Sequence, residues 1–219
     1  MHFNRLRNAI NSYNQIKFFY KKIDMVAIPD QPQKMTVEEY LEWEPQQDIR
    51  YEYVNGEVFA MTGATIPHND IALNFYRNLY PHLQPKGCKV NVSDVKVQVT
   101  PQSPYYYPDV IDSCDPEDLK ARKFYQNPKL IAEVLSPGTS SKDRGEKFTY
   151  YINMPSLQEY ILIDSEKISV ERYCRGEGRM WLYYPYIAGD IVTLSSIGFE
   201  CPIELFYEGI LFETANSEQ

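Results

Sequence analysis

The sequence predicts an α/β protein in which a mixed sheet is flanked by helices. A nearly continuous apolar run, residues 130–135, is typical of a strand that is covered on both faces. A helical stretch at 143–152 separates it from a second apolar strand at 159–164. A strand–helix–strand crossover implies a parallel pair, whereas the shorter connections earlier in the chain imply antiparallel pairs.

The other elements follow from periodicity, capping and turn residues. In chain order the sequence predicts a short helix from Thr36, a hairpin at 50–61 with its turn at Asn55-Gly56, a helix from Pro67 with an apolar residue at every fourth position from Ile71 to Leu83, strands at 89–99 and 105–112, a surface helix or loop at 115–126, a strand at 168–173, and short strands at 181–184, 191–194 and 203–206. The alternation within 89–99 slips near Ser93-Asp94, which predicts a β-bulge.

Charge is distributed unevenly along the 219 residues. The net charge is −8, but residues 1–24 carry five basic side chains and one acidic one, or +4, so the remainder sums to −12 (−8 minus +4). DNA-binding proteins usually show a basic footprint, and the acidic balance argues against tight non-specific binding. We interpret residues 1–24 as a disordered or dispensable leader, 25–212 as one domain and 213–219 as a tail.

The cysteines and the hydropathy indicate a cytoplasmic protein. Cys88, Cys114, Cys174 and Cys201 are widely spaced and form no C-x-x-C pair, which argues against a zinc site and a disulfide scaffold. We therefore expect reduced thiols. No apolar run approaches the roughly 18 residues of a membrane span, so no membrane partner is expected.

Glu133 is the most informative residue because it lies inside an apolar strand, where a charge is costly unless it is paired or bound to a cation. It shares a strand face with Ile131 and Leu135. Alternatively, the strand ends there and Glu133 meets solvent or an arginine. Asp109 lies in the preceding strand, and pairing of the two strands would bring both carboxylates to one sheet edge. Such a pair suits Mg²⁺, which can activate water and polarise a phosphate.

Several segments resemble the Uma-two family of restriction endonucleases, within the PD-(D/E)XK superfamily. The segments are Met35–Leu41, Tyr51–Glu57, Pro108–Val110, Ala132–Pro137, Lys142–Lys147 and Glu159–Asp164. The resemblance runs from about residue 35 to residue 208, and 132–147 is its most specific part. It implies a restriction-endonuclease-like fold, Mg²⁺ or Mn²⁺ as cofactor and DNA as substrate. A homodimer is consistent with it, since two strands need two cuts.

One position departs from the superfamily pattern. Leu135 stands where the pattern has lysine, so catalysis needs a cation from elsewhere. Lys147, on the following helix, is the best substitute, with Lys142 and Arg144 as rivals. Alternatively, Lys147 and Asp143 form an ordinary surface pair one helical turn apart.

The sequence therefore yields a functional hypothesis with alternatives. Asp109 and Glu133 would hold metal, Lys147 would assist catalysis, and Glu52, Glu57 and His68 are weaker additions to the site. The hypothesis is a metal-dependent endonuclease that hydrolyses DNA phosphodiester bonds. The alternatives are a catalytically inactive nucleic-acid-binding module that retains the fold, and a hydrolase of RNA or of a small phosphate ester.

Overall fold

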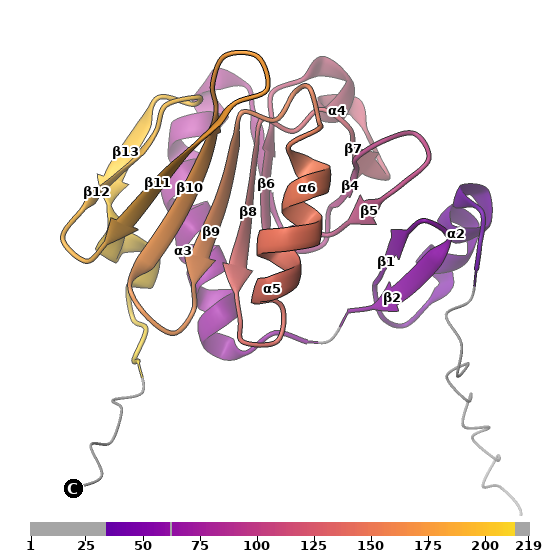
Figure 1. Ribbon diagram of the computed structural model, residues 1–219, viewed down its shortest axis with the longest axis horizontal. Helices are drawn as coiled ribbons and strands as arrows, with labels where there is room; N and C mark the ends of the chain where they lie inside the picture. Colours follow the sequence, from indigo (N-terminus) through magenta and orange to yellow (C-terminus); the bar gives the residue numbers. More distant parts are fainter. Residues whose placement is uncertain (1–33, 62, 213–219) are drawn as a thin grey trace, which may run out of the picture. The chain divides into compact units, whose positions relative to one another are not determined.

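A six-stranded sheet, a five-stranded sheet and a small two-stranded sheet form the framework of the protein (Figure 1). The structure is a computed structural model that describes residues 34–61 and 63–212. The predicted leader, the first residues of the predicted domain and the tail at 213–219 lie outside the described residues.

The six-stranded sheet contains the predicted crossover. Its strands, in spatial order, are β11 (Trp181–Ile187), β10 (Ser169–Arg175), β9 (Glu159–Asp164), β8 (Leu130–Leu135), β6 (Val110–Ser113) and β3 (Lys89–Val92). The β8–β9 pair is parallel and the other pairs are antiparallel. The mixed sheet is confirmed.

The five-stranded sheet shows that two predicted strands are each two strands. Its members, in spatial order, are β2 (Glu57–Ala60), β1 (Tyr51–Val54), β5 (Tyr105–Tyr106), β4 (Lys96–Gln98) and β7 (Phe124–Tyr125). The chain passes from one sheet to the other at Ser93, where φ is 57°, and again at Pro108-Asp109. The predicted bulge at Ser93-Asp94 is therefore wrong: the slip in alternation marks a change of sheet. The two crossing points are joined, because Ser93 N donates to Asp109 O at 2.9 Å.

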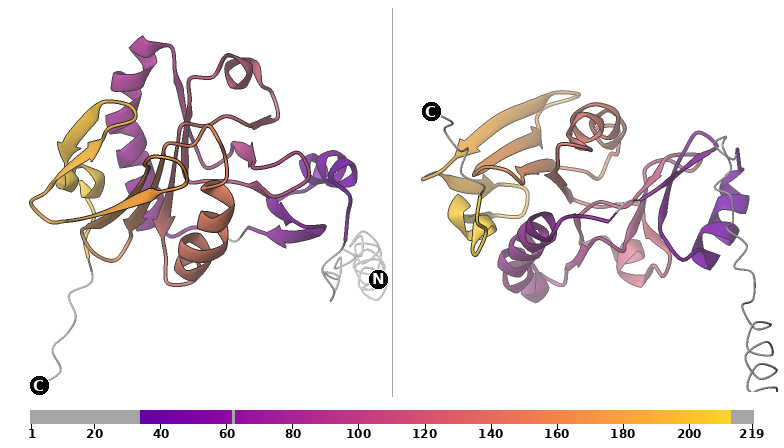
Figure 2. Two further views of the ribbon diagram at one scale, coloured as in Figure 1. Left: turned by 45° about the horizontal axis from the view of Figure 1, so that its top comes forward. Right: turned by 90° about the horizontal axis from the view of Figure 1, so that it is seen from below.

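Helices cover both faces of the six-stranded sheet, with α3 on one side and the α5–α6 segment on the other (Figures 1 and 2). The helical elements are α2 (Val37–Trp43), η2 (Glu44–Gln46), α3 (Ile66–Leu83), η3 (Gln84–Lys86), α4 (Pro116–Lys120), α5 (Ser140–Lys142), a π-helix η4 (Asp143–Lys147), α6 (Phe148–Tyr151) and η5 (Ile203–Tyr207). The capping box at Thr36 is present. The strand predicted at 203–206 is wrong, since those residues form the 3-10 helix η5. The small sheet is β12 (Ile191–Leu194) with β13 (Phe199–Pro202).

Strand β8 separates two hydrophobic cores, as its alternation predicts. Leu130, Ala132 and Val134 pack with α3, whereas Ile131 and Leu135 pack on the α6 side. Glu133 thus points into a mainly apolar layer on the α6 side. Leu135 is only 3% exposed and fills this layer, so the position that carries lysine in the superfamily pattern is a packing position here.

The expectation of reduced thiols is wrong for one pair of cysteines. Cys88 precedes β3 and Cys114 follows β6, and the register Lys89↔Ser113 brings them face to face, with a disulfide between them. A separation of 26 residues in sequence did not reveal this pairing. Cys174 and Cys201 are free. Among the described residues, no helix has both the length and the apolar character needed to cross a membrane.

Candidate active site

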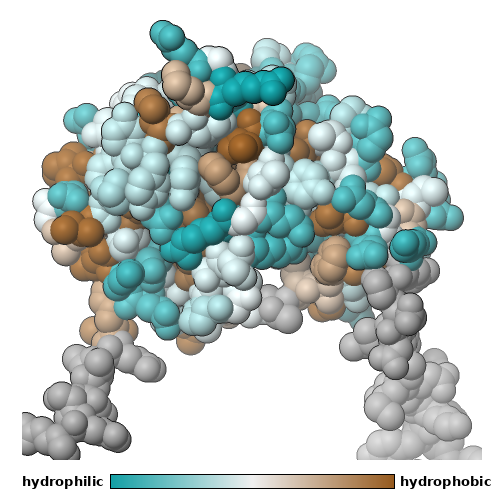
Figure 3. Space-filling view, viewed as in Figure 1, coloured by the Kyte–Doolittle hydropathy of each residue, from teal (hydrophilic) through white to brown (hydrophobic). Residues whose placement is uncertain are grey.

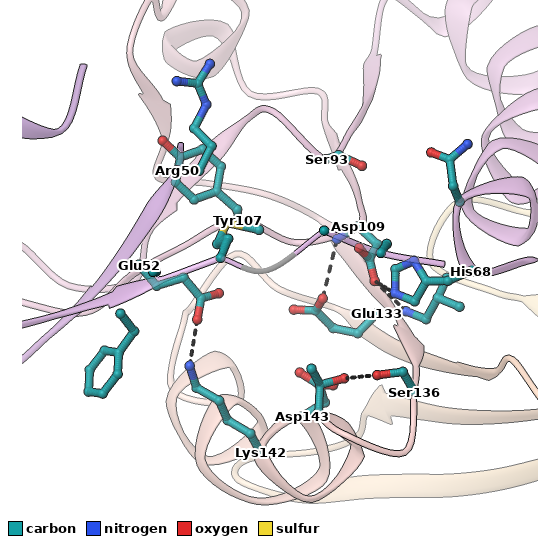
Figure 4. A pocket seen from close by; sticks show the side chains of 18 of the residues that line it. Arg50, Glu52, His68, Ser93, Tyr107, Asp109, Glu133, Ser136, Lys142 and Asp143 are labelled. Atoms are coloured by element: carbon teal, nitrogen blue, oxygen red, sulfur yellow. Dashed lines mark hydrogen bonds and ion pairs between the residues drawn. The ribbon is translucent and has the colours of Figure 1, made fainter. Parts of the chain in front are cut away.

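Asp109 lies where the chain passes between the two sheets. Pro108 before it has no N–H and cannot continue a ladder, and β6 begins at the next residue. The Oδ2 atom of Asp109 accepts a hydrogen bond from Val134 N at 2.7 Å and lies 3.2 Å from Nε2 of His68 (Figure 4). Its own N–H points to Oε2 of Glu133 at 3.4 Å. The backbone of β8 therefore holds the Asp109 carboxylate beside Glu133.

Glu133 is buried, and the ammonium group of Lys147 lies beside its carboxylate. It is 3% exposed, and its Oε1 lies 3.0 Å from Nζ of Lys147 and 3.3 Å from the hydroxyl of Tyr151. Burial raises the pKa of Glu133 well above its ordinary value; Lys147 opposes this shift, and neighbouring carboxylates, first Asp143 and then Asp109, reinforce it. A cation in the pocket would favour the charged form of Glu133.

Lys147 lies between three carboxylates. Its Nζ is 3.0 Å from Glu133, 3.3 Å from Glu52 and 3.3 Å from Asp143. The predicted pair with Asp143 exists, but it is buried rather than on the surface, since the two side chains are 9% and 3% exposed. Burial alone would lower the pKa of Lys147, but the charges of Glu133, Glu52 and Asp143 raise it well above its usual value. Lys147 is therefore a protonated, fixed cation.

The π-helix gives this lysine its position. Residues 143–147 form a single π-turn between α5 and α6, and both charged ends, Asp143 and Lys147, are buried while Gly145 in the middle is exposed. A π-turn inserts one extra residue into an α-helix and is frequent at functional sites. Asp143 and Lys147 are four residues apart, and their charged groups meet at 3.3 Å beside Glu133 of β8.

Glu52 joins the site and Glu57 does not. Glu52, in β1, bonds Nζ of Lys142 at 2.6 Å as well as Lys147. Burial would raise its pKa, but the two lysines outweigh burial and the pKa is lowered. Glu57 lies beside the hairpin turn opposite Val54 and does not line the pocket. The alternation of the hairpin puts both glutamates on one face, but only Glu52 is far enough from the turn to reach the junction.

His68 supports Asp109 from the first turn of α3, which Thr65 caps. Burial would lower the pKa of His68, but the hydrogen bond and charge of Asp109 raise it overall. The imidazole therefore remains protonated to higher pH than a free histidine and neutralises part of the charge of Asp109.

These groups line a pocket of about 580 Å³ at the junction of the sheets (Figure 4). It contains five carboxylates, Glu52, Asp94, Asp109, Glu133 and Asp143, against three cations, Arg50, Lys142 and Lys147, a formal balance of −2 before His68 is counted (three positive minus five negative). Sequence reasoning missed the contribution of Tyr151, because a tyrosine four residues beyond Lys147 is equally typical of core packing.

The donor set suits a hard divalent cation. Among residues 34–61 and 63–212, no group of three or more His, Cys, Asp or Glu side chains forms a ready-made metal site. Mg²⁺, however, uses one or two carboxylates and completes its shell with water and phosphate oxygens. Asp109 and Glu133 supply that pair, and the excess negative charge of the pocket favours a cation.

A mixed sheet with helices on both faces, and buried carboxylates where its strands diverge, defines a restriction-endonuclease-like α/β protein. Residues 37–204 match the Uma2 family, described as "Putative restriction endonuclease". The chain belongs to this family.

The chain is also similar to two proteins of known sequence and to one solved structure. Two proteins of Synechocystis sp. (strain ATCC 27184 / PCC 6803 / Kazusa) are similar: "Uncharacterized protein slr1290" is 37% identical over 82% of this chain and 94% of its own length, and "Uncharacterized protein sll1609" is 34% identical over 68% and 85%. The crystal structure of a "putative nuclease belonging to DUF820" from Anabaena variabilis ATCC 29413 aligns with a TM-score of 0.65 over 80% of this chain and 98% of that chain, at 16% identity. This last likeness supports the fold.

Proposed function

We propose that the protein is a metal-dependent endonuclease that hydrolyses DNA phosphodiester bonds. The observation that carries this proposal is the buried Glu133 beside Asp109 in an open pocket whose charge favours a cation. A purely structural carboxylate in an apolar layer is costly, and replacement by an apolar residue would often be neutral or stabilising.

Each side chain has a defined task in this proposal. Asp109 and Glu133 would hold Mg²⁺, or Mn²⁺ in its place, and the bound ion would supply activation of a water and polarisation of the phosphate. The Val134 N–H and His68 orient the Asp109 carboxylate. Such supporting contacts keep ligands in the geometry that a metal requires.

Lys147 acts through Glu133 in this scheme. Its side chain is 9% exposed and its Nζ already contacts three carboxylates, so it is placed to hold Glu133 and to neutralise charge beside the attacking water rather than to bind the outer phosphate oxygens. Lys142 is 34% exposed at its side chain and is the more accessible cation.

The test is cleavage of plasmid and of single-stranded DNA with and without Mg²⁺ or Mn²⁺. Glu133→Gln and Asp109→Asn should each lower cleavage by about 100-fold or more, since they remove the metal ligands. Glu57→Gln is the matched control, because Glu57 is a carboxylate outside the pocket, and it should cleave normally. Metal-independent cleavage, or full activity of Glu133→Gln, would falsify the assignment.

A binding module that retains the fold is the second candidate. The observation in its favour is that Lys147 already compensates Glu133 without any metal. If the protein is only a binding module, it should bind DNA in a binding assay, and the DNA should remain intact with every divalent cation. The same assay with RNA of equal sequence tests the choice of DNA as substrate.

A further inference from the structure

Phe59 is an exposed aromatic side chain outside the hydrophobic cores. It is 40% exposed and belongs to none of the three hydrophobic clusters of the described residues, whereas its neighbour Val58 packs beneath the hairpin. Phe59 pairs across the hairpin with Glu52, so it stands on the same face and lines the pocket.

The wall around Phe59 is apolar and accessible. Ile49, which is 47% exposed, and Met61 line the pocket on the same side, from the two ends of the hairpin. Nζ of Lys142 lies 5.2 Å from the centroid of the Phe59 ring. An exposed ring beside a cation and next to catalytic carboxylates is the combination by which proteins hold unpaired nucleotides, with the base on the ring and the phosphate on the cation.

The charges around the pocket do not suit a duplex. Duplex DNA presents one phosphate charge per roughly 1.7 Å of axis and is held by rows of basic side chains. Of the described residues at the pocket, the partly exposed cations are Arg50 and Lys142, and each is close to a carboxylate: Arg50 is 3.7 Å from Asp94 and Lys142 is 2.6 Å from Glu52. Two cations suffice for one or two phosphates. The whole chain has a net charge of −8, and the face shown in Figure 3 mixes hydrophilic residues with hydrophobic patches.

Glu133 and Lys147 lie deep in the pocket. Glu133 and Lys147 are 3% and 7% exposed, so the phosphate that reacts must enter the pocket. An unpaired strand can bend into such a pocket more readily than a stiff duplex can.

We propose that the pocket receives an unpaired nucleotide, with its base stacked on Phe59 and its phosphate directed to Lys142. The inference rests on the proposed nuclease function and names its substrate as single-stranded DNA, including frayed ends and loops.

The experiment measures binding of one labelled oligonucleotide, as a single strand and as a blunt duplex, by fluorescence anisotropy in EDTA. The variants are Phe59→Ala, Phe59→Leu and Phe59→Trp, with Tyr80→Ala as control, since Tyr80 is 46% exposed on α3 outside the pocket. The single strand should bind more tightly than the duplex. Both Phe59→Ala and Phe59→Leu should weaken its binding by roughly 5-fold or more, the loss of one stacked base. Phe59→Trp and Tyr80→Ala should bind like the wild type.

Wild-type binding by Phe59→Leu, or equal binding of duplex and single strand, would overturn the inference. Cleavage of the same oligonucleotides with Mg²⁺ separates this failure from failure of the proposed function. If cleavage depends on Glu133 but not on Phe59, the proposed nuclease function stands and the stacking site is wrong. If binding depends on Phe59 but no cleavage occurs, the stacking site stands and the proposed nuclease function is wrong.

Discussion

At the scale of single residues, two buried acids on neighbouring strands differ in whether a cation lies beside them. Glu133 has Lys147 and Tyr151 as partners. Asp112, in β6, is 0% exposed, and neither side-chain oxygen has a hydrogen-bond partner among the described residues. Burial raises the pKa of Asp112 to about 7. A neutral acid is the form that this apolar surrounding favours.

Asp112 should therefore make stability depend on pH. The unfolded carboxyl titrates near 3.8 and the folded one near 7, so between these values the native state binds more protons than the unfolded state. The free energy of unfolding then falls as pH rises through this window and levels off above it. Asp112→Asn does not titrate, and from pH 4 to pH 8 it should gain on the wild type by about 4 kcal/mol, three pKa units at 1.36 kcal/mol each.

Urea unfolding of both proteins at several pH values measures this difference. Asp48→Asn, at an exposed position, is the control and should track the wild type at every pH. A constant difference between Asp112→Asn and the wild type would show that folding does not change the pKa of Asp112.

At the scale of elements, the π-turn at Asp143–Lys147 sets the rotation of α5 relative to α6. Each residue of an α-helix rotates the chain by about 100°, since a turn takes 3.6 residues. Removal of one residue from the π-turn should restore a regular helix and rotate Asp143 relative to Lys147.

We expect deletion of Gly145 to abolish cleavage while helix and sheet content, measured by circular dichroism, stay near the wild type. Gly145→Ala is the matched control: no atom lies within 4 Å of the added methyl group. It should keep activity and add about 0.5–1 kcal/mol to the free energy of unfolding. Normal cleavage by the deletion variant would show that the π-turn is dispensable.

The disulfide is the second feature at this scale. Cys88 and Cys114 join β3 to β6 at the ends remote from Ser93 and Asp109. Closing a loop of 26 residues lowers the entropy of the unfolded chain, which corresponds to about 3.5 kcal/mol in the chain-entropy treatment. A reductant, or Cys88→Ser with Cys114→Ser, should lower the free energy of unfolding by roughly that amount. If a reductant leaves the wild-type unfolding curve unchanged, the pair does not contribute in solution.

At the scale of the whole molecule, Lys147 connects the two large sheets. Its amine bonds Glu52 of the five-stranded sheet and Glu133 of the six-stranded sheet, and Asp143 of the crossover helix completes the set. The same contacts that define the candidate site therefore also hold the sheets together.

Lys147→Met should lower the free energy of unfolding at neutral pH by about 3–5 kcal/mol, because it leaves buried carboxylates without their cation. Mg²⁺ or Mn²⁺ should recover part of the loss, which thermal unfolding with and without the ions measures. Lys142→Met is the control, since Lys142 is partly exposed and bonds only Glu52 of these carboxylates; it should cost no more than about 1 kcal/mol. An equal loss of unfolding free energy for both variants would show that Lys147 is no more important to stability than Lys142.

The sequence by itself determined what depends on local pattern. The alternation of residues 130–135 placed Glu133 on the face of Ile131 and Leu135, the Asn55-Gly56 turn defined a hairpin, and an apolar strand before and after a helix predicted the parallel pair β8–β9. Each of these properties depends on neighbours a few residues away, so a single sequence contains them.

The tertiary structure decided which distant residues meet. Ser93 and Asp109 change sheets at the same point, Glu52 reaches Lys147 and Glu57 does not, and Cys88 faces Cys114. These outcomes depend on strand register and on a helix with one extra residue. Alternative registers bury similar apolar residues, so a single strand pair does not fix its register. Only the total free energy of the contacts in both sheets selects one register.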